Sequence, residues 1–140
     1  MTIPLSELDT INIILKGKMG RLGCIDNDEP YVVPINYLLD GRSILSHSLP
    51  GKKIHAMRAN PRVCLQVDQI HDNYRWRSAI AFGRFVEIER PAERRAVIAK
   101  LLSRFPQLTP VESAIVHDAA APDSIVFRIE VERLTGVEEE

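Results

Sequence analysis

Residues 30–61 hold the stretch that decides the fold: residues 30–37 read PYVVPINY, residues 46–48 read SHS, residues 51–53 read GKK and residues 60–61 read NP. The apolar run over residues 31–39 predicts a strand, and the Asp40-Gly41 pair predicts a hairpin into a second strand over residues 44–48. Residues 52–59 then have the pattern of a short helix, which Asn60-Pro61 ends. A polar strand end therefore meets a glycine and two lysines at the start of a helix.

Strand-like patterns recur on both sides of this stretch, over residues 19–25, 63–68, 76–88 and 124–131. Gly83 interrupts the long third run and indicates a bulge or a sharp bend. Pro34 cannot donate a ladder hydrogen bond, so it indicates a sheet edge or a bulge. Six strands in hairpin order avoid exposed edges by closing into a small barrel. We expect a mainly β, six-stranded barrel with peripheral helices, built as a single domain over residues 1–140.

Helical patterns account for most of the remaining chain. Ser6 and Asp9 resemble a capping box for a first helix that ends near Gly17. Pro91 opens an amphipathic helix whose apolar stripe is expected in the core. A further short helix is predicted over residues 109–116, a loop over 119–123, a polar connection over 69–75 and a solvated, frayed tail over 138–140.

Charge and hydropathy exclude several function classes. Eighteen basic and 19 acidic residues give a net charge of -1, which argues against a nucleic-acid binder that relies on a general positive field. No apolar run approaches the roughly 20 residues that span a bilayer. The first residues have neither the basic segment nor the apolar segment of a signal peptide. We therefore expect a cytoplasmic protein without a membrane partner.

The cysteines and histidines do not suggest a metal site. Cys24 and Cys64 each lie in an apolar strand-like run, where a buried free thiol is favoured over a disulfide or a nucleophile. The four histidines, His47, His55, His71 and His117, show no ligand spacing of a known type. We predict no metal.

The GKK run is a candidate phosphate site. A helix start exposes unpaired N–H groups and a partial positive charge, glycine permits close approach, and Lys52 and Lys53 add full charges. The alternative is a solvated helix face. His47 and Ser48 end the preceding strand, so their side chains should lie near such a phosphate, although His47 is equally well explained as a half-buried strand-end residue. Pro34 and Asn36 share one strand face, where Asn36 offers a donor and an acceptor or bonds its local backbone.

Five segments in this order resemble one known family. They are residues 20–25 (GRLGCI), 31–37 (YVVPINY), 44–48 (ILSHS), 51–53 (GKK) and 60–68 (NPRVCLQVD). The chain resembles the pyridoxamine 5′-phosphate oxidase-like flavin-binding split barrels, and within them most closely the branch that contains the nitroimidazole-resistance proteins. The similarity covers roughly residues 20–88.

The resemblance implies a Greek-key split β-barrel that forms a homodimer and binds FMN between its subunits. It places Val33, Pro34, Ile35 and Asn36 beside the isoalloxazine ring. It places His47 and Ser48 by the ribityl chain or the ring, and Gly51, Lys52 and Lys53 at the phosphate. Ser78 matches a position where the oxidase has a flavin-contacting glutamine, and Trp76 either covers the site from the partner subunit or packs in the dimer interface.

Two departures from the oxidase point away from vitamin B6 as the substrate. Val33-Pro34 stand where the oxidase has an arginine in its first flavin-contacting strand, and residues 128–137 lack its arginine-rich substrate segment. We expect an FMN-dependent oxidoreductase that reduces a small electron-poor molecule such as a nitroaromatic, with His47 donating a proton or orienting the substrate. The alternatives are a flavin storage or sensing module without turnover, and the same barrel binding a deazaflavin or heme. No Gly-x-Gly-x-x-Gly fingerprint indicates a Rossmann-type nicotinamide site.

Overall fold

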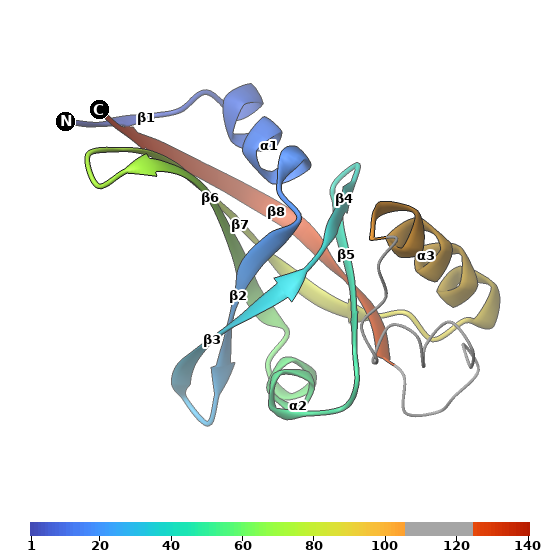
Figure 1. Ribbon diagram of the computed structural model, residues 1–140. Helices are drawn as coiled ribbons and strands as arrows, with labels where there is room; N and C mark the ends of the chain where they lie inside the picture. The colour runs from blue at the N-terminus through green and yellow to red at the C-terminus, as the bar shows by residue number, and fades with distance from the viewer. Residues whose placement is uncertain (106–124) are drawn as a thin grey trace.

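The computed structural model describes residues 1–105 and 125–140, which form an antiparallel sheet flanked by helices (Figure 1). In chain order the elements are β1 (Thr2–Pro4), α1 (Glu7–Lys16), β2 (Met19–Asp26), β3 (Glu29–Asn36), β4 (Leu38–Asp40), β5 (Ser43–Ser48), α2 (Lys52–Ala59), β6 (Arg62–Asp72), β7 (Arg75–Glu87), α3 (Pro91–Arg104) and β8 (Ile125–Glu139). Within these residues no helix is long and apolar enough to cross a membrane.

The strand order makes the sheet curl on itself. The strands lie in the order β3-β2-β6-β7-β8-β5-β4, with β1 paired to β8 off this path. The two outermost strands, β3 and β4, are consecutive in the chain and are separated by Tyr37 alone. Because one residue joins opposite edges of the sheet, the sheet must bend round until those edges meet, and no ladder closes the seam. This is the mainly β split barrel that the sequence predicts.

Two backbone features of the predicted barrel are confirmed. Pro34 lies on the edge strand β3, which pairs only with β2 among the described strands, so its missing donor costs no ladder bond. The β7–β8 register shifts between Phe82 and Gly83. A Cβ on Gly83 would lie 2.1 Å from the Glu130 carbonyl oxygen, so only glycine lets the strands approach this closely.

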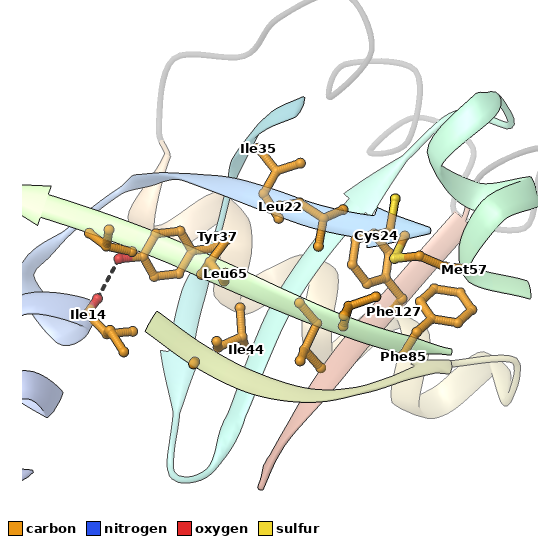
Figure 2. Packing of buried hydrophobic residues seen from close by; sticks show 14 of the residues in the cluster. Ile14, Leu22, Cys24, Ile35, Tyr37, Ile44, Met57, Leu65, Phe85 and Phe127 are labelled. Carbon is orange, nitrogen blue, oxygen red and sulfur yellow. Dashed lines mark hydrogen bonds between the residues drawn. The ribbon is translucent and has the colours of Figure 1, made fainter. Parts of the chain in front are cut away.

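Tyr37 occupies the corner between the two sheet edges and is fully buried in the barrel core. Its hydroxyl donates a 2.6 Å hydrogen bond to the carbonyl of Ile14 near the end of α1 (Figure 2). Burial raises the pKa of Tyr37 well above its usual range, and the nearby Arg104 guanidinium opposes that rise. The corner is thus fixed by packing and by a bond to the helix that covers this end of the barrel.

A second, smaller core lies outside the barrel, where α3 packs on β5 and β8 (Figure 1). Leu45 and Val126 contribute from the strands, and Val97, Ile98 and Leu101 from the helix. Charged contacts fix the helix: Lys100 lies 2.7 Å from Asp40, and Arg128 lies 2.9 Å from Glu93. The predicted apolar stripe of this helix is confirmed as core.

Several sequence expectations need correction. Residues 31–39 form two strands rather than one, because the chain changes sheet edge at Tyr37, and β1 adds a further short strand. Residues 69–72 continue β6 instead of forming a loop, and the tail is not frayed, because β8 reaches Glu139 and pairs with β1 and β7. The predicted helix over 109–116 and the loop over 119–123 lie outside the described residues.

Candidate functional site

The start of α2 is open. Gly51 occupies the N-cap in extended backbone, without a side-chain capping bond, and the first turn of the helix has no acidic residue. A Cβ added at Gly51 would meet nothing within 4 Å. An anion can therefore approach the exposed N–H groups of this turn without displacing a protein group.

Lys52 is held against the β2–β3 hairpin. Its Nζ lies 3.6 Å from Asp26 Oδ2 and 4.7 Å from the centre of the Tyr31 ring. Asp26 ends β2, and Tyr31 lies on β3 opposite Cys24. The contacts bring the start of α2 next to the strand that carries Val33 to Asn36.

Lys53 is half-buried beside the barrel wall. Burial lowers the pKa of Lys53, and the neighbouring Cys24 thiol opposes that change. The pKa of Cys24 is raised, first by its own burial and then by Asp26 and Cys64. An anion bound here would favour the charged form of Lys53.

The open seam of the barrel brings β3 and β5 together. Ser46 is buried and its Oγ donates a 2.7 Å hydrogen bond to the carbonyl of Asn36. Ser48 is buried and bonds the carbonyl of Leu49. His47 is half-buried and, by strand alternation, faces the other way, on the side of Leu45. Asn36 and Ser46 therefore meet at this seam, and His47 and Ser48 follow on β5, just before α2, with their side chains on opposite faces of the strand.

Strand alternation separates the four predicted β3 residues into two faces. Val33 and Ile35 point into the core, whereas Pro34 is exposed and Asn36 is half-buried on the outer face. Side-chain contacts with a ligand outside the barrel are thus open to Pro34 and Asn36, whereas the side chains of Val33 and Ile35 are directed into the core.

Trp76 and Ser78 do not join this cluster in one chain. Pro34 pairs with Arg21, Arg21 with Gln66 and Gln66 with Ile80, so three interstrand spacings, about 14 Å, separate β3 from β7. Ser78 and Trp76 lie still farther along β7. Trp76 instead lines a depression of about 350 Å³ with Ile70, His71 and Glu138.

The outer face of the sheet carries a polar ladder that sequence reasoning missed. Gln66 Nε2 donates to Asp68 Oδ2 and to Ser78 Oγ, each at 3.0 Å, and Arg21 Nη1 lies 3.1 Å from Asp68 Oδ2. The available signal was the position of Gln66 and Asp68 between the apolar residues Val63, Leu65 and Val67, which indicates an outward face but gives no partners for it. Asp26, Tyr31 and Ser46 were also missed, because their contacts depend on which elements become neighbours.

A larger hollow of about 540 Å³ lies on the same outer face, between the β2–β3 hairpin and β7. Gly23, Cys64, Phe82 and Gly83 line it, and the Arg133 guanidinium lies 3.9 Å from the centre of the Phe82 ring. Cys24 is buried in the core and Cys64 faces this hollow, so the expected free thiols are confirmed, although Cys64 is only half-buried. In the described part of the chain no group of side chains has the arrangement of a metal site.

Comparisons with known proteins agree with this architecture. Residues 6–138 match the family described as pyridoxamine 5′-phosphate oxidase. The uncharacterized protein RA0666 of Rhizobium meliloti is 33% identical over 143 residues, covering 94% of this chain and 91% of the relative. A FAD-binding protein from Mesorhizobium loti has a solved structure with a TM-score of 0.76 and 30% identity, covering 100% of this chain and 99% of that one.

A lower-identity structure shows the same fold. It belongs to a candidate 5-nitroimidazole antibiotic resistance protein from Bacteroides thetaiotaomicron, with a TM-score of 0.79 and 24% identity, covering 99% of this chain and 87% of that one. The family match extends well beyond the similarity over residues 20–88 and includes β8. The chain belongs to the pyridoxamine 5′-phosphate oxidase family.

Proposed function

We propose that this protein is a flavoprotein and that it binds FMN in a cradle formed by residues 33–36 of β3, His47 and Ser48 at the end of β5, and residues 51–53 at the start of α2. The phosphate would lie at the start of α2. The main observation behind this proposal is that the N-terminus of α2, which has two lysines and no side-chain cap, lies beside the edge strand β3. Family membership and the FAD-binding relative support a flavin as the ligand. Gly51 leaves the approach open, and Lys52 and Lys53 supply the charge.

Each part of the cradle has a role in this proposal. The backbone of Val33 and Ile35 and the side chains of Pro34 and Asn36 flank the ring. Ser48 and His47 lie between the ring and the phosphate. Because Ser46 fixes the Asn36 carbonyl, the ring side of the cradle is preorganised.

Bound flavin supplies electron transfer, and we propose an oxidoreductase that acts on a small electron-poor molecule such as a nitroaromatic. We propose that His47 holds or releases a proton near the reacting ring, a role that histidine often has in enzymes. A His47→Ala variant should keep its flavin and lose turnover. Unchanged turnover and substrate affinity would remove this role, and a flavin that never passes electrons to any acceptor would favour a storage or sensing module.

A homodimer completes the proposed site. Trp76 and Ser78 lie on the outer face of β7, too far from β3 to serve the cradle of their own chain. The same face carries the exposed Val32 and Ile70 and the 540 Å³ hollow. We propose that two outer faces meet, so that Trp76 and Ser78 of each copy reach the flavin held by the other. The cytoplasm is the proposed location.

Titration of the apoprotein with FMN and with riboflavin tests the phosphate assignment, because riboflavin lacks only the phosphate. Replacing Lys52 or Lys53 with Met removes a charge-assisted contact, which should weaken FMN binding about 10-fold or more and leave riboflavin unchanged. Lys16→Met, an exposed lysine at the end of α1, is the matched control. Equal losses for both ligands, or no loss for either, would place the phosphate elsewhere.

A further inference from the structure

We propose that Asp26 is a built-in competitor of the cofactor phosphate, because it holds Lys52 on the β2–β3 hairpin whenever the cradle is empty. This inference rests on the proposed function and adds a residue that regulates how tightly the cradle binds.

The contacts of Lys52 support a holding role for the hairpin. Its ammonium lies 3.6 Å from Asp26 Oδ2, and the Tyr31 ring is 4.7 Å from the same nitrogen. Both contacts come from the same hairpin, on its β2 and β3 sides. The turn between them is fixed in shape, because Asn27 and Asp28 both adopt positive φ, at 50° and 66°. The two groups that contact Lys52 therefore lie on either side of one tight two-residue turn.

The same ammonium is needed at the start of α2. Lys52 is the first residue of the helix, so its side chain can turn either to the hairpin or to an anion at the exposed N–H groups. Its side chain is 59% exposed, which leaves it room to move, whereas that of Asp26 is 27% exposed. One ammonium cannot make its best contact with both anions, so the carboxylate and a phosphate compete for it.

Lys53 does not share this competition. It is half-buried and faces Cys24, an uncharged thiol near neutral pH, rather than a carboxylate. Lys53 can thus contact the phosphate without first breaking an ion pair. Lys52 can contact the phosphate only after its ion pair with Asp26 has been broken. The expected result is a cradle whose FMN affinity is lower than its two lysines would otherwise give.

The Asp26→Asn variant removes the charge and keeps the shape. It should tighten FMN binding about two- to five-fold, the range of an exposed ion pair, and leave riboflavin binding unchanged. The gain should shrink in high salt, because exposed charges are screened. Glu29→Gln is the matched control, since Glu29 pairs with Asp26 across the hairpin and is exposed.

A double-mutant cycle separates holding from simple repulsion of the phosphate. In the Lys52→Met background, Asp26→Asn should have no effect on FMN affinity, because the held side chain is gone. An equal gain with and without Lys52, or an equal gain from Glu29→Gln, would overturn the proposal. Asp26→Ser repeats the test with a smaller side chain, and thermal melting of each variant checks that it folds.

The outcomes also distinguish this inference from the proposed function. If Lys52→Met and Lys53→Met leave FMN affinity unchanged, the phosphate assignment fails. If Lys52→Met weakens FMN binding but Asp26→Asn does not tighten it, the cradle stands and only the competing role of Asp26 is wrong.

Discussion

At the residue scale, two glycines of this barrel are needed for opposite reasons. Gly83 has no room for a side chain, because the Glu130 carbonyl oxygen would lie 2.1 Å from a Cβ there. A Cβ added at Gly51 would meet nothing within 4 Å. Neither residue has the positive φ that makes glycine a backbone requirement, so any difference between them comes from contacts.

Alanine at each position should separate the two roles. Gly83→Ala should lower the free energy of unfolding by about 3 kcal/mol, because the β7–β8 pairing must spread to admit the methyl group. Gly51→Ala should change it by less than about 1 kcal/mol, the usual effect at an N-cap, and should weaken FMN more than riboflavin. Urea unfolding measures the first effect and ligand titration the second. Equal stability losses would mean that the close approach at Gly83 relaxes freely.

At the element scale, Tyr37 links three parts of the fold. It joins β3 to β4 across the seam, fills the core beneath them and bonds the Ile14 carbonyl of α1 (Figure 2). A Cβ on Gly17 would lie 2.4 Å from the Tyr37 hydroxyl, so the chain after α1 also packs tightly on it. Arg104 of α3 donates a 2.5 Å hydrogen bond to the Gly17 carbonyl and so ties the outer helix to the same point.

This buried hydroxyl predicts an alkaline limit to stability. The folded-state pKa of Tyr37 is raised, so above about pH 10 the unfolded chain loses this proton while the folded chain keeps it. The contribution of the protonated Tyr37 hydroxyl to stability is fully present below about pH 10. Above that pH, the free energy of unfolding falls by about 1.4 kcal/mol for each unit by which the pH rises. Tyr37→Phe should be less stable by about 1 kcal/mol at neutral pH and should lack this part of the alkaline slope. Parallel slopes for the two proteins, measured by urea unfolding, would contradict the prediction.

Local sequence patterns were sufficient to predict most of the helices and strands. Helix α1 begins after Ser6, whose Oγ accepts from the Asp9 amide as predicted, and α2 spans the predicted residues. The strand-like pattern predicted over residues 63–68 lies within β6, where Val63, Leu65 and Val67 alternate on the buried face. The break at Tyr37 was not predictable, because its apolar neighbours continue the strand pattern and only the sheet order requires the chain to change edges.

The candidate site shows the same division between local and long-range information. Gly51, Lys52 and Lys53 were found because they are adjacent in sequence at a helix start. The contacts of Lys52 with Asp26 and Tyr31 span more than twenty positions and arise from the packing of α2 on β2. Family resemblance supplied Trp76 and Ser78, which no pattern in a single chain relates to the cradle.

At the scale of the whole molecule, the proposed site needs two chains. One copy contributes the α2 start and the β3–β5 seam, and the other contributes the outer face of β7. The termini lie together at the far end of the barrel from α2 (Figure 1).

Subunit mixing tests the shared site. A Lys52→Met, Lys53→Met double variant and a Trp76→Ala variant should each bind FMN weakly as homodimers. In a mixed dimer one of the two sites has both intact halves, so a mixture unfolded and refolded together should regain about a quarter of the wild-type sites if chains pair at random. No recovery, together with a monomer in sedimentation, would contradict the shared site.

The most direct test of the central claim is the absorption spectrum of freshly purified protein, followed by mass identification of the molecule released on denaturation. We expect a flavin spectrum, with FMN released at one molecule per chain. Released FAD would keep the flavin and correct the nucleotide, and a Soret band would indicate heme instead. A colourless protein that takes up neither FMN nor FAD would show that this chain is not a flavoprotein.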